Sequence, residues 1–162
     1  MPDPGAFADY ICMPTEDVHP KPAHLSWTQA AAIPLSGLTA WRAAVTQGEV
    51  KPGQKVLISG AGGGVANFAL QWCVQLGAQV YVTSGSEEKI ARAKTHGALG
   101  GVLYGGDDLR ARLKAMAGGI DLVIDGAGGQ GAMALIEALR PGGRYVCYGA
   151  TLGNPEGALD LR

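Results

Sequence analysis

Several kinds of feature are scarce in this chain of 162 residues, and each scarcity excludes a class of protein. Lysine and arginine nearly balance aspartate and glutamate, at 13 against 14, so no charged surface of the kind that binds nucleic acid or an anionic membrane is expected. No apolar run approaches the roughly 18 residues of a membrane span, and residues 1–10 resemble no signal peptide. We therefore expect a cytoplasmic protein with neither nucleic acid nor membrane as a partner.

Residues that bind metals or form disulfides are also few. The three cysteines, Cys12, Cys73 and Cys147, are an odd number, lie far apart and stand in apolar segments, so we predict buried, reduced thiols. The three histidines lack the spacing of a metal site. Aromatic residues make up only 6% of the chain, yet 47% of it is hydrophobic, which is enough for one domain with a buried core.

Glycine, in contrast, is abundant, and its 26 copies mark the ends of alternating β-like and α-like segments. The expected strands are residues 55–59, 79–84, 101–104, 121–125 and 144–149. The expected helices between them are residues 65–76, 86–96, 107–117 and 130–140. This alternation predicts an α/β fold of the Rossmann type, a doubly wound parallel sheet with helices on both faces and five visible strands in the order 3-2-1-4-5.

The segment that precedes this alternation has a different pattern. Residues 5–22 indicate a strand with a proline-rich exit, which we assign to another layer or domain. Ser26 and Gln29 form the pattern of a helix capping box, and a second helix is expected from Pro34 to Gly48.

Four glycines fall within residues 60–64, between the first expected strand and the first helix of the alternation. A strand, a glycine turn and a helix N-terminus form a site for an anion such as a pyrophosphate, because free N–H groups and the helix dipole point at the turn. The fit to the dinucleotide fingerprint is imperfect, and the turn could simply need positive φ angles. A Walker A loop is excluded because no Gly-Lys-Ser/Thr sequence follows.

Five stretches together resemble the medium-chain dehydrogenase/reductase superfamily, and especially its zinc-independent quinone oxidoreductase-like and alcohol dehydrogenase-like members. They are "GAFADYICMP", "AAAIPLSGLTAWRAA", the long segment from "VKPGQKVLISGAGGGVANFALQW" to "KTHGA", "DLVIDGAGG" and "LRPGGRYVCYGA". The resemblance implies that residues 1–25 are the tail of a GroES-like substrate domain and that residues 26–162 are an incomplete Rossmann domain. It also implies that the chain is a fragment. Because half of the substrate cleft is then missing, we expect the fragment to be inactive alone, and we expect the complete protein to be a homodimer.

The resemblance further implies an NADP(H)-dependent oxidoreductase that transfers hydride between nicotinamide and a quinone, enone, aldehyde or alcohol as its small-molecule substrate. Backbone at Gly63, Gly64 and Val65 would hold the pyrophosphate. The residues implied to border the ribose and nicotinamide are Thr39, Gly126, Ala127, Tyr148, Gly149 and Ala150. For Thr39 the alternative is a hydrogen bond within its own helix, and for Gly126 and Gly149 it is a role in ending strands.

No residue is assigned as catalytic. Asp125 and Tyr148 stand at strand ends, but we expect the carboxylate to satisfy local backbone donors and the phenol to pack.

The cofactor preference depends on residues 83–89, because NAD-specific domains carry Asp or Glu about 20 residues beyond the glycine turn. The segment reads "TSGSEEK", in which Ser84, Ser86 and Lys89 could bind a 2′-phosphate, and Tyr104 matches a family tyrosine at the adenosine end. The alternative is that Ser84 and Glu87 form a capping box and that Lys89 is solvated. We predict NADP(H), with NAD(H) as the weaker ligand.

The resemblance also bears on metal. In zinc-dependent relatives a cysteine ligand precedes the Gly-x-Thr element, and here that position is Leu35, so we predict no zinc. A non-catalytic nucleotide-binding module of the Rossmann type remains the alternative function. A methyltransferase is disfavoured because the second strand does not end in an acidic residue.

Overall fold

The computed structural model describes residues 7–105 and 108–153 and divides the chain into two compact units, residues 1–33 and 34–162. In the first unit, the described residues contain the short 3₁₀ turn η1 (Thr15–Asp17) and helix α1 (Trp27–Ala31). The predicted capping box is confirmed, since Ser26 Oγ accepts from Gln29 N at 3.2 Å and Ser26 N donates to Gln29 Oε1 at 2.9 Å.

The strand predicted within residues 5–22 is wrong for the part that the structure describes. Residues 7–22 form no β-ladder, and the side chains of Phe7 and Tyr10 are exposed. A strand requires hydrogen-bonded neighbours, and the described part of the chain supplies none here. The unit boundary falls after Ile33, later than the predicted boundary after residue 25, and the assignment of residues 1–25 to a substrate domain stays a prediction.

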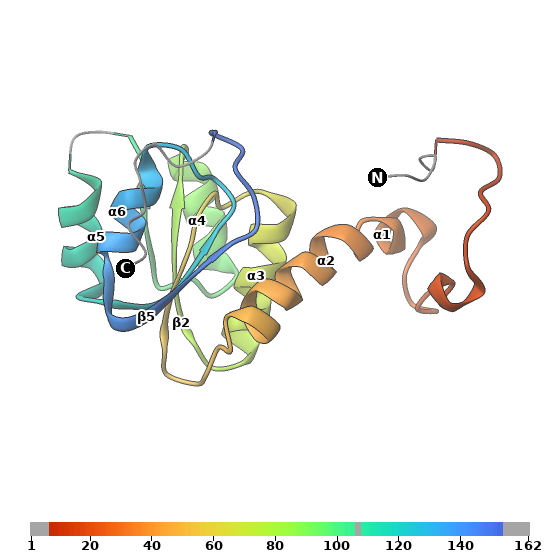
Figure 1. The fold of residues 1–162 in the computed structure, drawn as a ribbon, viewed down its shortest axis with the longest axis horizontal. Helices are drawn as coiled ribbons and strands as arrows, with labels where there is room; N and C mark the ends of the chain where they lie inside the picture. The colour runs from red at the N-terminus through yellow and green to blue at the C-terminus, as the bar shows by residue number, and fades with distance from the viewer. Residues whose placement is uncertain (1–6, 106–107, 154–162) are drawn as a thin grey trace. The chain divides into compact units, whose positions relative to one another are not determined.

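The second unit contains a five-stranded parallel sheet in the order β3-β2-β1-β4-β5, which confirms the predicted fold class. Its strands are β1 (Lys55–Ile58), β2 (Gln79–Ser84), β3 (Gly100–Leu103), β4 (Ile120–Asp125) and β5 (Leu139–Cys147). Its helices are α2 (Pro34–Trp41), η2 (Arg42–Gln47), α3 (Gly64–Gln75), α4 (Glu87–Thr95), α5 (Leu109–Ala117) and α6 (Gly131–Glu137). Figure 1 shows these helices around the sheet.

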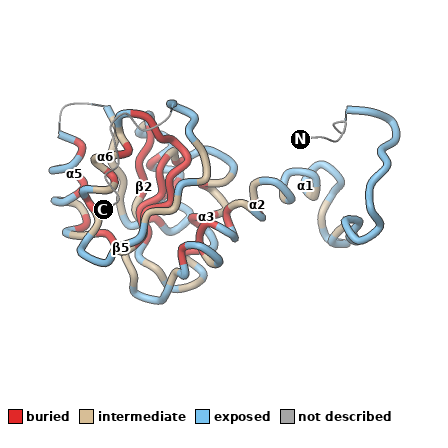
Figure 2. The backbone as a smooth tube through the Cα atoms, viewed as in Figure 1, coloured by how far each residue is buried: buried red, intermediate tan, exposed pale blue. Residues whose placement is uncertain are grey.

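The two faces of the sheet have separate apolar cores. Successive residues of β1 point to opposite faces, so Val56 and Ile58 pack with α2, η2, α3 and α4, whereas Leu57 packs with α5 and α6. In Figure 2 the buried residues concentrate on the strands at the centre of the sheet. Because both faces are covered, the central strands are nearly continuous apolar runs.

Two elements differ from the sequence prediction. The helix expected from Pro34 to Gly48 changes after Trp41 into the π-helical turn η2, and Glu49 follows with a φ of 47°. The last helix ends at Glu137, and Leu139 already pairs with Ile120 in β5. The segment 140–143 is therefore an irregularity within a strand, before Arg144 pairs with Leu122.

No helix in the described part of the chain is long and apolar enough to cross a membrane. Of the three cysteines, Cys73 is buried in α3 as predicted, but Cys12 and Cys147 are exposed. Cys147 is exposed because it ends β5, which is an edge strand of the sheet.

Candidate functional site

The glycine turn after β1 leads directly into α3 at the carboxyl edge of the sheet. Gly60 and Gly62 have φ angles of 69° and 104°, and Gly63 caps the helix without a side-chain hydrogen bond. The N–H of Gly63 is used inside the turn, since it donates to Gly60 O at 3.1 Å. The N–H groups of Gly64 and Val65 belong to the first turn of the helix, where no intrahelical acceptor exists, so both are donors that could bind a ligand.

The end of β2 is fastened to this turn. Ser84 is buried, and its hydroxyl donates to Ala61 O at 3.1 Å, while Ala61 N donates to Thr83 O at 2.8 Å. The capping box considered for Ser84 and Glu87 does not form, because Ser86 is the N-cap of α4 and has no side-chain capping hydrogen bond.

The structure brings Lys89 to the glycine turn. A Cβ placed on Gly62 would come within 2.7 Å of Lys89 Cδ, so the stem of the exposed lysine lies against this glycine. Tyr104 lies nearby after β3, with its ring 3.3 Å from the position of a Cβ on Gly85. Of the residues predicted for the adenosine end, Ser84 and Lys89 therefore contact the glycine turn, and Tyr104 lies at the end of β2.

A narrow cavity lies beside these residues, on the face covered by α5 and α6. Ser59, Thr83, Tyr104, Ala127 and Gly128 contribute to its lining. Thr83 Oγ1 is buried and has no hydrogen-bond partner among the described residues. An unsatisfied buried hydroxyl is costly, so its place on the wall of a cavity favours a ligand that completes the bond.

The turn after β4, residues 126–129, forms the next part of the site. Gly126 N donates to Ser59 Oγ at 3.0 Å, and Ala127 N donates to Asp125 Oδ1 at 2.8 Å. Both predicted residues therefore use their N–H groups internally, and only their shape and surface are available to a ligand. Asp125 is fully buried and serves local donors, as predicted from the sequence.

The remaining predicted residues lie toward α2. Tyr148 packs on Gly126 so closely that a Cβ there would be 2.3 Å from Tyr148 Cζ. Thr39 and Tyr148 line one shared cavity, and Gly149 and Ala150 lie beside the turn after β4. Thr39 Oγ1 donates to Leu35 O at 2.7 Å, so the bond within its own helix, which the sequence left open, is present. Burial raises the pKa of Tyr148 to about 12, which keeps the phenol protonated near neutral pH.

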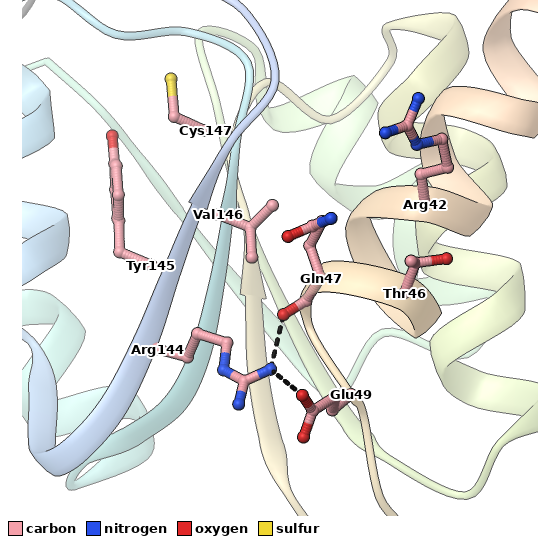
Figure 3. Close-up of a pocket in the computed structure, with 8 residues that line it drawn as sticks. All are labelled: Arg42, Thr46, Gln47, Glu49, Arg144, Tyr145, Val146 and Cys147. Atoms are coloured by element: carbon pink, nitrogen blue, oxygen red, sulfur yellow. Dashed lines mark hydrogen bonds and ion pairs between the residues drawn. The ribbon is translucent and has the colours of Figure 1, made fainter.

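A second, wide cavity lies between η2 and β5 (Figure 3). Arg144 connects the two elements, because one of its guanidinium nitrogens donates to Gln47 O at 2.6 Å and pairs with Glu49 Oε1 at 3.0 Å. The hydrogen bond and charge of Arg144 lower the pKa of Glu49. No sequence pattern indicated this pairing, because the residues are almost a hundred positions apart and belong to different elements.

Sequence reasoning also missed contributions to the site. Ser36 Oγ lies 2.7 Å from the position of a Cβ on Gly64, which puts a hydroxyl beside the N-terminus of α3. Ser59 and Tyr145 bind Asp125 through their hydroxyls. The sequence offered one signal for this network: Ser59 and Asp125 are each a polar residue at the end of an apolar strand.

The described residues contain no group of three or more histidine, cysteine, aspartate or glutamate side chains that could hold an ion. Leu35, at the position where the zinc-dependent relatives were expected to carry a ligand, is exposed. The absence of zinc stays a prediction.

Comparisons with known proteins now identify the chain's relatives. Residues 64–162 match the family model described as zinc-binding dehydrogenase. The chain is 43% identical over 158 residues to the zinc-type alcohol dehydrogenase-like protein YogA of Leptosphaeria maculans, which covers 93% of this chain and 44% of that protein. It is 31% identical over 157 residues to a 2-haloacrylate reductase of Burkholderia sp., covering 94% of this chain and 47% of that one.

Solved structures of oxidoreductases also resemble this chain. An NAD-dependent alcohol dehydrogenase superposes with a TM-score of 0.89 and 40% identity, over 97% of this chain and 46% of that chain. The Escherichia coli quinone oxidoreductase complexed with NADPH superposes with a TM-score of 0.78 and 34% identity, over 85% and 43%. The chain thus spans less than half the length of these relatives.

Proposed function

The chain belongs to the medium-chain dehydrogenase/reductase superfamily, a family of oxidoreductases, and from this premise we propose that it is the cofactor-binding domain of an NADP(H)-dependent member. The substrate class we propose is a quinone, an enone, an aldehyde or an alcohol. Relatives include a protein named as a quinone oxidoreductase and one named as an alcohol dehydrogenase, which supports this range without narrowing it.

The position of Lys89 carries the choice of cofactor. Its stem lies against Gly62, in the turn whose helix would receive the pyrophosphate, so its ammonium group is within reach of a phosphate on the adjacent ribose. Ser86 adds a hydroxyl that is not used for capping, and β2 ends in Ser84 instead of the carboxylate that favours NAD. The relatives differ in this respect: one is named NAD-dependent and another is complexed with NADPH, so the argument rests on the chain's own residues.

The residues present fit the nucleotide at three points. Gly64 and Val65 would hold the pyrophosphate on the first turn of α3, and Gly63 would shape the turn. The adenosine would lie against Tyr104 and the end of β2, next to the small cavity where the Thr83 hydroxyl still lacks a partner. Ribose and nicotinamide would border Thr39, the turn at Gly126 and Ala127, and the segment from Tyr148 to Ala150.

The bound cofactor would supply hydride transfer at its nicotinamide ring. In this proposal the chain's residues bind and orient the cofactor and exclude water from one side of it. Tyr148 packs against the turn after β4 and, with its pKa raised to about 12, stays protonated near neutral pH. We assign no catalytic residue, and we propose that the complete protein forms a homodimer.

A fluorescence titration of the protein with NADPH and NADH tests the proposal. Saturable binding with NADPH as the tighter ligand is expected. The second candidate, a nucleotide-binding module without turnover, is favoured only by the absence of an assignable acid or base among these residues. Steady-state assays of the complete protein with quinones and enones separate the two, because a module would bind NADPH but not oxidise it.

A further inference from the structure

We infer that Ser59, Asp125 and Tyr145 form a network of positioning residues that fixes the turn after β4 against the cofactor. The inference rests on the proposed function, and it assigns a positioning role to three side chains that the proposal does not use to contact the cofactor.

The network joins three neighbouring strands at the carboxyl edge of the sheet. Asp125, at the end of β4, has no exposed surface. Its carboxylate accepts hydrogen bonds from the hydroxyl of Ser59, which follows β1, and from the hydroxyl of Tyr145 in β5. Burial and the hydrogen bond to Asp125 raise the pKa of Tyr145, so the phenol stays protonated and donates to the carboxylate.

The same atoms hold three consecutive backbone amides. Ser59 Oγ accepts from Gly126 N at 3.0 Å and from Ala127 N at 3.3 Å. Asp125 Oδ1 accepts from Ala127 N at 2.8 Å and from Gly128 N at 3.3 Å. These N–H groups are buried, and without the two side chains each would lose a hydrogen bond. The conformation of the turn is therefore set by side chains from outside it.

The turn after β4 contacts two parts of the candidate site, the cavity beside Thr83 and the side toward α2. Ala127 and Gly128 line the cavity beside Thr83, and Gly126 supports the ring of Tyr148. Ser59 also directly precedes Gly60, the first residue of the glycine turn. A shift in the network would therefore move the surface under the adenosine and the surface toward α2 together.

The chain provides a matched control on the same strand. Asp121, near the opposite end of β4, accepts from Lys55 N at 2.7 Å and forms an ion pair with Arg140, so it also connects strands. Asp121 lies away from the carboxyl edge and touches no part of the site. Loss of Asp121 should reduce stability without changing the turn.

The experiment compares Tyr145→Phe, Ser59→Ala and Asp125→Asn with Asp121→Asn. For each variant we would measure the melting temperature, the dissociation constants of NADPH and NADH, and hydrogen exchange at the amides of residues 126–128. We expect each of the three network variants to bind both cofactors about 10-fold more weakly than Asp121→Asn does. This difference should appear even though all four variants lose a similar amount of melting temperature. Exchange at residues 126–128 should rise in these variants only.

Asp125→Asn should retain more affinity than Asp125→Ala, because an amide keeps one oxygen for the Ala127 N–H and the Tyr145 hydroxyl can accept from its NH₂ group. Unchanged exchange in Tyr145→Phe and Ser59→Ala, or an affinity within 2-fold of the control, would overturn the inference. Failure of the unaltered protein to bind either cofactor would instead overturn the proposed function, and the exchange data would still decide whether the network fixes the turn.

Discussion

Replacing Lys89 with alanine should convert a domain that prefers NADPH into one that hardly distinguishes the two cofactors. The lysine stem lies against Gly62, at the glycine turn, and no acidic residue ends β2. A hydrogen bond to a charged group contributes about 1.5–3 kcal/mol, and the lower end applies because Lys89 is exposed to solvent and salt. The variant should therefore bind NADPH about 10-fold more weakly and NADH almost unchanged.

The assay is a fluorescence titration of both reduced cofactors at matched, low ionic strength, where screening is smallest. Lys94→Ala is the control, since it removes the same charge from the last turn of the same helix. An equal loss of affinity for NADPH and NADH in Lys89→Ala, or an equal loss in Lys94→Ala, would show that Lys89 does not contact the phosphate.

Three further predictions concern stability and metal. Gly62→Ala should lower the free energy of unfolding by about 1–3 kcal/mol, because φ at this position is 104°. It should also bind NADPH more weakly, because the new methyl group meets the stem of Lys89. Thermal melting and titration measure the two effects, with Gly105→Ala as the control because a Cβ there meets open space. Burial raises the pKa of Cys73 from 9.0 to about 12 and that of Tyr148 from 10.0 to about 12, so both groups stabilise the fold fully below pH 9 and this contribution falls as the pH rises toward 12. A melting temperature that is constant from pH 9 to 12 would disprove that contribution. A chelator should leave the melting temperature unchanged, whereas stoichiometric zinc in elemental analysis of the purified protein would refute the prediction of a metal-free domain.

The fold was largely predictable because its signals are local. Apolar runs of the right length gave the five strands, and glycines such as Gly77 and Gly97 marked the ends of the helices between them. The glycine turn was recognisable for the same reason, since strand, turn and helix start are adjacent in the sequence.

The errors occurred where a distant contact decides the local conformation. Residues 140–143 interrupt a strand because Leu139 pairs with Ile120, which a sequence ending in "RPGG" does not reveal. The alternative considered for Ser84, a capping box with Glu87, is likewise decided at a distance, because the Ser84 hydroxyl bonds to Ala61 O across the sheet edge. The predicted N-terminal strand is absent because its described residues have no partner, a fact that lies outside the segment itself.

The sequence indicated where residues of the candidate site lie better than it indicated which of their N–H groups are available to a ligand. Lys89 lies against Gly62 in the glycine turn, and Tyr104 lies against Gly85 just after β2. The N–H groups of Gly63, Gly126 and Ala127, however, are already bound within the protein. Whether a backbone donor is free depends on side chains far away in the sequence, so spacing alone could not show it.

A crystal structure of the protein grown with NADPH tests the central claim most directly. The account predicts the pyrophosphate on the N–H groups of Gly64 and Val65, the adenosine against Tyr104 and the end of β2, and the 2′-phosphate within hydrogen-bonding distance of Lys89 or Ser86. A nucleotide bound elsewhere on the protein, or a 2′-phosphate directed away from α4 into solvent, would contradict it.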